Sequence, residues 1–186
     1  MLMLSLDYVV FIGRFQPFHL AHMKTIEMAL EKSRYVIIAL GSAQEERSVK
    51  NPFLAKEREE MILSNFNQVQ QKRIIFIHII DVYNDEKWVN QVKSKVSEKT
   101  GSAQHVGLIG HFKDNSSYYL ALFPEWELIE LESLENALSA TPMREDFYKG
   151  QIQEKYFPQG TINFLNDFKK KEDYERLRTQ FFKDKA

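Results

Sequence analysis

The sequence predicts an α/β protein whose core is an open, doubly wound sheet of five mostly parallel strands. Short, continuous apolar segments alternate with amphipathic segments along most of the chain. Continuous rather than alternating apolar runs are typical of strands that are buried on both faces of a parallel sheet. With 186 residues, of which 44% are hydrophobic, the chain has enough apolar material for the core of one such domain.

Five apolar segments are the predicted strands. Each is rich in β-branched or aromatic residues, and most end next to Gly, Asp or Ser, which interrupt strands. They cover residues 8–12, 35–40, 74–80, 106–109 and, with the weakest pattern, 126–131. Because amphipathic segments separate them, we expect right-handed crossovers between parallel strands.

The segments between the strands carry helical periodicity. Residues 20–32 repeat apolar positions at helical spacing, and residues 116–123 form a shorter candidate. Asn51 is predicted to cap a helix that begins at Pro52 and ends near residue 66. Asp85 is predicted to cap the following helix.

From Pro142 onward the chain is helical and increasingly charged. Thr141 and Pro142 are predicted to be the cap and the first residue of a helix. Residues 169–173 are expected to form a solvated joint between two terminal helices. We therefore expect a main domain at 1–150 and a helical C-terminal extension at 151–186 that packs on it.

The composition excludes several classes of function. The 25 basic and 26 acidic residues give a net charge of −1, without the basic excess typical of proteins that grip nucleic acid. The absence of Cys excludes disulfides, thiolate metal sites and a Cys nucleophile. The N-terminus lacks a basic segment, and the apolar run at 8–12 is too short to span a membrane. We expect a cytoplasmic protein without membrane or nucleic-acid partners.

The first predicted strand leads into a segment suited to phosphate. Gly13 allows a sharp turn and a close approach of the backbone to a ligand. A helix that begins near His19 would direct backbone N–H groups and its positive dipole end at that ligand. His19 and His22 are three residues apart and can face one point. Such a pair can also be a surface feature or part of a metal site. The motifs of zincins, Walker loops and dinucleotide-binding Gly-rich turns are absent from the sequence.

Residues 13–22, Gly-Arg-Phe-Gln-Pro-Phe-His-Leu-Ala-His, resemble the first signature of the nucleotidyltransferase superfamily. The form with Gly-Arg-Phe-Gln-Pro-Phe is similar to that of archaeal-type nicotinamide mononucleotide (NMN) adenylyltransferases and of the adenylyltransferase half of bifunctional Nudix proteins. Ala21 stands where the family usually has Gly, so we expect slightly less room beside the triphosphate.

Further stretches extend the resemblance over about residues 8–150. Residues 41–44 and 48–53, with Glu57 and Arg58, are similar to the family's second loop and the helix after it, and Lys50 stands where the family often has Arg. Residues 110–126 resemble the Nudix-fused branch, and residues 139–144, Ser-Ala-Thr-Pro-Met-Arg, match the second signature. The tail contains no Nudix box, so we expect no ADP-ribose hydrolysis from this chain.

The resemblance implies a Rossmann-like nucleotidyltransferase fold and transfer of AMP from ATP to NMN by direct in-line attack, giving NAD and pyrophosphate. It implies catalytic roles for His19, His22 and Arg144. The residues implied to bind ATP and its phosphates are Gly13, Arg14, Phe15, Gln16, Lys50, Gly110, Asp114, Ser139 and Thr141. Those implied to bind NMN are Ser42, Asp81 and Trp88. It also implies assembly into homo-oligomers, although no feature of the sequence sets the number of subunits.

Two of these assignments can also be argued from the residue types. Arg144 can offer forked donors to phosphates beside a helix N-terminus. The Trp88 indole can stack on the cationic nicotinamide ring or, as an alternative, serve as a core aromatic. Mg²⁺ is expected to bridge the phosphates of ATP with few or no direct ligands from the protein.

Other functions stay open at this point. The same fold and motifs would suit transfer of an adenylyl or cytidylyl group to nicotinate mononucleotide, phosphopantetheine or flavin mononucleotide. A module that binds nucleotides without catalysis is a further alternative. Retention of His19, His22 and Arg144 together argues against that module.

Overall fold

The computed structural model describes residues 4–102, 105–111, 115–131 and 138–186. Its contacts divide the chain into two compact units. The first comprises the described parts of Met1–Arg14, Lys24–Gln44 and Gln68–Ala137, and the second comprises Phe15–Met23, Glu45–Asn67 and Leu138–Ala186. The expected domain boundary at residue 150 stays a prediction.

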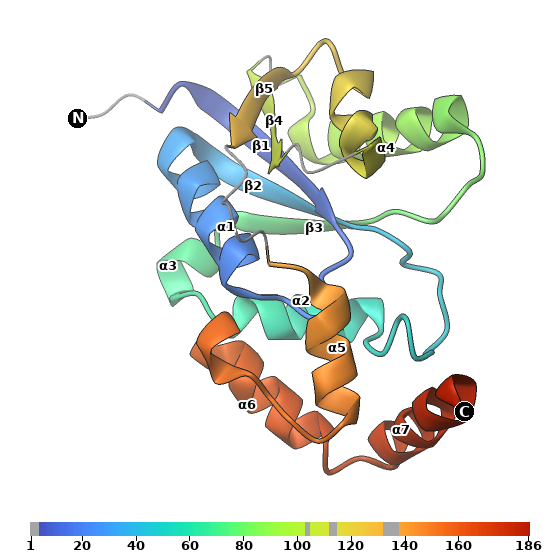
Figure 1. Cartoon of the computed structure of the whole chain (residues 1–186). Coiled ribbons are helices and arrows are strands. Elements are labelled where there is room, and N and C mark those ends of the chain that lie inside the picture. Colours follow the sequence, from blue (N-terminus) through green and yellow to red (C-terminus); the bar gives the residue numbers. More distant parts are fainter. Residues whose placement is uncertain (1–3, 103–104, 112–114, 132–137) are drawn as a thin grey trace. The chain divides into compact units, whose positions relative to one another are not determined.

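The first unit contains a five-stranded sheet in which every pair of neighbours is parallel, as predicted (Figure 1). Its order is β3-β2-β1-β4-β5. The strands are β1 Leu6–Gly13, β2 Ser33–Leu40, β3 Ile74–His78, β4 Val106–His111 and β5 Glu127–Leu131. The order reverses between β1 and β4, and the crevice beyond the carboxyl ends of two such strands is where doubly wound folds bind ligands.

Two helical layers explain why the strands are apolar on both faces. One face packs against α4 (Asp85–Thr100) and the 3-10 helix η1 (Asn115–Leu122), and its core includes Val10, Ile37 and Val92. The other face lies against α1 (Leu20–Lys32), which begins in the second unit and continues in the first (Figure 1). The short helix α3 (Gln68–Gln71) was not predicted.

The second unit is helical and contains a cluster of phenylalanines. Its helices are α2 (Ala55–Leu63), α5 (Ala140–Tyr148), the 3-10 helix η2 (Glu154–Tyr156), α6 (Gln159–Phe168) and α7 (Glu172–Lys185). Phe53 packs edge-on against Phe164 and Phe168, with ring centroids 5.4 and 5.0 Å away. A side chain at Gly160 would collide with Ser64, so glycine lets α6 approach the end of α2 closely.

Three predicted helix starts are wrong by one to three residues. Asn84 caps α4 instead of Asp85, and its side chain accepts from the Lys87 N–H at 2.9 Å. Helix α2 begins after Leu54 instead of at Pro52, because the Glu57 carboxylate accepts from the Leu54 N–H at 2.9 Å. Asn51 lies in a loop.

Helix α5 begins at Ala140 with Ser139 as its cap, instead of beginning after Thr141. Pro142 is tolerated there because the first-turn N–H groups of a helix have no partner within it. The predicted joint at 169–173 is confirmed for residues 169–171, because α6 ends at Phe168, whereas Glu172 and Asp173 already belong to α7. Within the described part of the chain, every helix is too short or too polar to cross a membrane.

Candidate active site

The histidine pair lies at the start of α1, in the second unit. The two imidazole rings are stacked, with centroids 3.6 Å apart and planes 18° apart. The His19 backbone N–H donates to Nδ1 of His22 at 3.2 Å, so a neutral His22 ring carries its proton on Nε2. Phe15 and Phe18 pack on the His22 ring, with centroids 4.8 and 5.7 Å away. The ring is therefore held with a defined donor, as oxyanion stabilisation requires.

The segment that precedes the pair is anchored through Gln16, which is buried. Its side-chain oxygen accepts from the Phe53 N–H at 3.0 Å, and its side-chain nitrogen donates to the Phe53 carbonyl at 2.9 Å. Phe15 has a left-handed φ of 54° and a buried side chain. Any contact of Phe15 or Gln16 with a phosphate would therefore have to come from the main chain.

Arg144 connects the second signature to this segment. It lies on the second turn of α5, whereas the predicted start at Pro142 would have placed it on the first turn, because the helix begins at Ala140. Its Nη1 donates to the Gln16 carbonyl at 2.6 Å, and its Nη2 donates to Thr141 Oγ1 at 3.2 Å. These contacts fix the guanidinium on the main chain of the segment that precedes the histidine pair, within the same unit. Ser139 and Thr141 are exposed at the N-terminus of α5.

Lys50 is exposed on the loop that precedes α2. The Tyr148 hydroxyl of α5 donates to the carbonyl of the neighbouring Val49 at 2.8 Å. Burial raises the pKa of Tyr148, so this hydroxyl keeps its proton and its donor role. A cavity of about 420 Å³ in the second unit is lined by Lys50, Thr141 and Arg144 among others.

The structure places the other candidate residues in the first unit. Gly13 ends β1, and its carbonyl accepts from the Gly41 N–H at 2.8 Å. Arg14 follows directly and is partly buried. Ser42, after β2, is buried with a left-handed φ of 49°. A Cβ at Gly110 would lie 2.8 Å from a terminal methyl of Leu120, so a larger residue there would need the Leu120 side chain to shift.

The two remaining first-unit candidates have partners of their own. Asp81 is exposed, its N–H donates to the Gln44 side chain at 3.0 Å, and its carboxylate accepts from that side chain at 3.3 Å. Trp88 is half-buried on α4 and meets Tyr119 and Phe123 edge-on at 6.1 and 5.9 Å. The core role of Trp88 is thus present, and its contact with nicotinamide stays a prediction. Asp114 lies outside the described residues.

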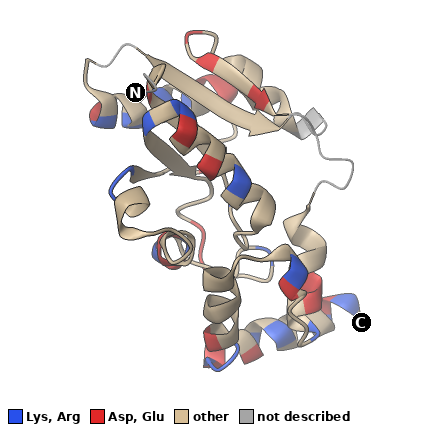
Figure 2. Ribbon diagram, turned by 90° about the vertical axis from the view of Figure 1, so that its left-hand side faces the viewer, with Lys and Arg blue, Asp and Glu red and all other residues tan. Residues whose placement is uncertain are grey.

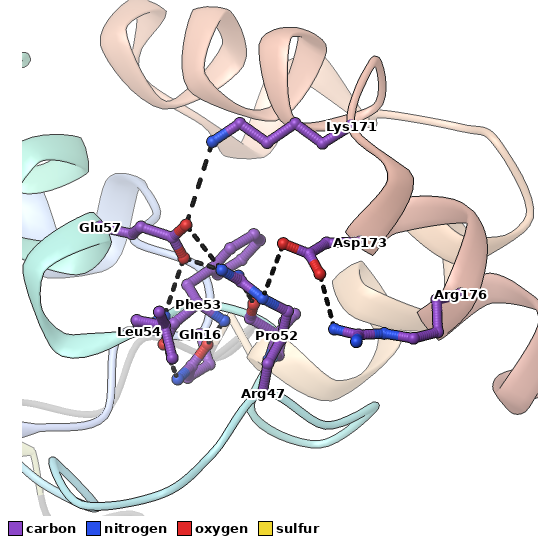
Figure 3. A network of polar contacts seen from close by, with 9 residues as sticks. All are labelled: Gln16, Arg47, Pro52, Phe53, Leu54, Glu57, Lys171, Asp173 and Arg176. Carbon is purple, nitrogen blue, oxygen red and sulfur yellow. Dashed lines mark hydrogen bonds and ion pairs between the residues drawn. The ribbon is translucent and has the colours of Figure 1, made fainter.

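Sequence reasoning missed two residues that organise the site. Tyr148 holds the Lys50 loop, and Arg47 joins that loop to α2 and α7 through Glu57 and Asp173 (Figure 3). Arg47 lies only three residues before Lys50, but nothing in the local pattern distinguishes it from an exposed arginine. Among the described residues, no three His, Asp or Glu side chains are grouped closely enough to hold a metal ion.

Comparison with known proteins identifies the family. A model of the cytidylyltransferase-like family matches residues 10–146. The chain belongs to this family. A nicotinamide/nicotinic acid mononucleotide adenylyltransferase of Acinetobacter baylyi is 62% identical over 96% of this chain and 95% of its own length. A nicotinamide-nucleotide adenylyltransferase of Thermococcus kodakarensis is 28% identical over 91% of this chain and 88% of its own length.

The family assignment also agrees with a solved structure. A bifunctional NMN adenylyltransferase/ADP-ribose pyrophosphatase of Francisella tularensis, crystallised with AMP and a manganese ion, superposes with a TM-score of 0.85 at 34% identity. The match covers 94% of this chain and 52% of that one, so this cytidylyltransferase-like chain spans about half of the bifunctional protein. The predicted resemblance to NMN adenylyltransferases and the predicted fold are both confirmed.

Proposed function

We propose that this chain transfers AMP from ATP to NMN, forming NAD and pyrophosphate. The observation that carries the proposal is the 62% identity, over nearly the full length of both chains, to an adenylyltransferase named for nicotinamide and nicotinic acid mononucleotides. The stacked histidine pair and the anchored Arg144 supply donors of the kind that the transfer of a phosphoryl group needs.

The reaction needs no covalent intermediate on the protein. An oxygen of the NMN 5′-phosphate forms a bond to the α-phosphorus of ATP, and the bond from that phosphorus to the α,β-bridging oxygen breaks. Its electron pair leaves with pyrophosphate. Because both reactants are anions, the protein's task is to hold them in line and to offset their repulsion.

We assign the following roles to the second-unit residues. His22 donates from Nε2 to an oxygen of the transferring phosphoryl group, and His19 assists from the stacked ring. Arg144 and Lys50 bind the leaving pyrophosphate, and the N–H groups at the start of α5, next to Ser139 and Thr141, favour the same anion.

The remaining candidate residues complete the assignment. Gly13, Arg14 and the main chain of Phe15 and Gln16 line the triphosphate. Gly110 and Asp114 contact adenosine, while Ser42, Asp81 and Trp88 contact the nicotinamide mononucleotide. The substrate is ATP with its bound Mg²⁺, an ion that proteins commonly bind through substrate phosphates and water with only one or two carboxylates.

The acid form of the substrate is the second candidate acceptor, because the 62% identical relative is named for both mononucleotides. We propose that the amide is preferred by about tenfold, since an exposed Asp81 carboxylate would repel the added carboxylate of nicotinate and an indole face attracts the cationic ring. The proposed reaction takes place in the cytoplasm, with ATP and the mononucleotide as partners. Assembly into a homo-oligomer also stays a prediction.

The test is release of pyrophosphate by the purified chain with ATP and each acceptor in turn: NMN, nicotinate mononucleotide, flavin mononucleotide and phosphopantetheine. We expect the highest kcat/KM with NMN. Turnover confined to one of the last two acceptors would refute the substrate assignment. Nucleotide binding without pyrophosphate release would identify a sensing module instead of an enzyme.

A further inference from the structure

The cavity beside the second signature is lined in part by residues of α7, which lies outside the family's signature motifs. Three segments of the second unit line it: the loop with Lys50, helix α5 with Arg144 and Glu145, and the end of α7 with Asp184 and Lys185. Its volume of about 420 Å³ equals roughly fourteen water molecules in the liquid, which is ample for a hydrated pyrophosphate. The last helix therefore borders the site proposed for the leaving group.

Helix α7 is held in this position by several contacts with α5. The Phe181 ring stacks on Tyr148, with centroids 5.1 Å apart. The Tyr174 hydroxyl donates to the Phe147 carbonyl at 2.6 Å, and Arg178 Nε donates to the Tyr148 carbonyl at 2.9 Å. Since these groups are buried or half-buried, the register of α7 on α5 is fixed, and so is the turn that carries Lys185.

The charges on this wall are of both signs, and Figure 2 shows Lys and Arg next to Asp and Glu along the C-terminal helix. Lys185 Nζ lies 3.1 Å from Glu145 Oε1, and the two side chains are 53% and 39% exposed. Asp184 accepts a hydrogen bond from Gln180. An ion pair this exposed is weak, so a ligand with several negative charges can compete with Glu145 for Lys185.

We propose that Lys185 is a further binding residue for the pyrophosphate end of ATP and for the pyrophosphate product. It joins Lys50 and Arg144 around the cavity, and Glu145 holds it there while the site contains no anion. This inference rests on the proposed function, because it assigns the cavity to the leaving group of that reaction. It makes α7 part of the binding site rather than a purely structural addition.

The test is the dissociation constant of magnesium pyrophosphate, measured by calorimetry at low salt for the whole chain and four variants. Lys185→Gln should weaken binding about three- to tenfold, because one cation leaves the wall. Glu145→Gln should tighten binding about two- to fivefold, because it frees Lys185 and removes a repulsive carboxylate. Lys183→Gln is the matched control, since Lys183 lies on the same turn, is exposed and does not line the cavity. It should stay within about 1.5-fold of the parent.

The fourth variant, Lys185→Arg, keeps the charge and should bind within about twofold of the parent. In the turnover assay Lys185→Gln should raise KM for ATP by the same factor as the dissociation constant and leave KM for NMN unchanged. Equal effects of Lys185→Gln and Lys183→Gln, or weaker binding in Glu145→Gln, would overturn the proposal. If the variants differ in pyrophosphate affinity as expected but the chain shows no turnover, the proposed reaction is refuted and the cation site stands. If turnover occurs and Lys185→Gln leaves it unchanged, the cation site is refuted and the proposed reaction stands.

Discussion

Arg47 is the centre of the polar network in Figure 3, and replacing it with Met tests how the second unit is stabilised. Its Nη1 and Nη2 donate to the two carboxylate oxygens of Glu57 at 2.7 and 2.9 Å. Nη1 also donates to the Pro52 carbonyl at 2.6 Å, and Nε lies 3.2 Å from the carboxylate of Asp173. The hydrogen bonds to Glu57 raise the pKa of Arg47, so the guanidinium stays charged.

The expected loss of stability follows from the burial of the Arg47–Glu57 pair and from the contacts that Met and Glu57 keep after the substitution. The side chains of Arg47 and Glu57 are only 12% and 17% exposed, and removal of one partner of a buried pair costs about 3–5 kcal/mol. Met keeps most of the apolar stem, and Glu57 keeps the Leu54 N–H as a donor. We therefore expect a loss near the lower end, about 3 kcal/mol in the free energy of unfolding.

Thermal and urea unfolding of Arg47→Met and the parent measure this loss. For a chain of this size, about 3 kcal/mol corresponds to a fall in Tm of about 6–12 °C. Lys56→Met is the matched control, because its ion pair with Glu59 has a similar distance of 3.1 Å while Lys56 is 79% exposed. The control should change stability by less than about 0.5 kcal/mol. An equal, small change in both variants would refute the argument that burial makes the Arg47 network strong.

Five further variants, at four residues, test the proposed site. His22→Ala should lower kcat about 10²–10³-fold with smaller changes in KM, and a change below about threefold would remove His22 from the mechanism. Lys50→Ala should raise KM for ATP more than KM for NMN, whereas Lys50→Arg should retain or improve the use of ATP; equal losses for both substrates would place Lys50 outside the site. Trp88→Ala should weaken binding of both mononucleotides and leave ATP binding nearly intact, so unchanged mononucleotide affinity would leave Trp88 as a core residue only. Tyr148→Phe removes only the hydroxyl that donates to Val49, so it should raise KM for ATP about two- to fivefold while KM for NMN stays constant, and parallel changes in both would indicate a general loss of structure.

The sheet could be predicted from the sequence because strands buried on both faces of a parallel sheet are continuous apolar segments. All five predicted strands are present, and each begins or ends within about two residues of its expected position. Helix α1 has the predicted bounds, because its apolar spacing and its neighbouring strands limit it from both sides. Patterns set by burial along the chain are therefore reliable guides to this fold.

The helix starts were predicted less well, because capping depends on which of several neighbouring polar side chains accepts a hydrogen bond from the first backbone N–H groups. Asn84 and Asp85 are adjacent and chemically similar, and only Asn84 accepts from the backbone N–H of Lys87. At α2, the carboxylate of Glu57 binds the Leu54 N–H and also pairs with Arg47. That second contact comes from the loop before the helix, and helical periodicity does not encode it.

The candidate site shows the same division between local and distant information. The first signature, with His19 and His22, is a single segment, and its two imidazole rings lie together, which their spacing of three residues permits. The anchoring of Gln16 by Phe53 and the support of Val49 by Tyr148 join residues 37 and 99 positions apart. Such pairs depend on tertiary packing, so no local sequence motif predicts them.

A common arrangement connects these distant contacts to the proposed reaction. Arg144, Tyr148 and Arg47 each donate a hydrogen bond to a main-chain carbonyl in a loop that carries or adjoins a candidate phosphate-binding residue. The carbonyls belong to Gln16, Val49 and Pro52 respectively. A charged or hydroxyl donor that fixes a loop before the substrate arrives reduces the ordering cost of binding. Variants of Tyr148 and Arg47 should therefore act on the affinity for ATP more than on kcat, whereas His22 should act on kcat. If variants of Tyr148 and Arg47 instead lowered kcat and left KM for ATP unchanged, these residues would have to influence the reacting phosphorus directly. Hydrogen bonds to the Val49 and Pro52 carbonyls would not explain such an effect.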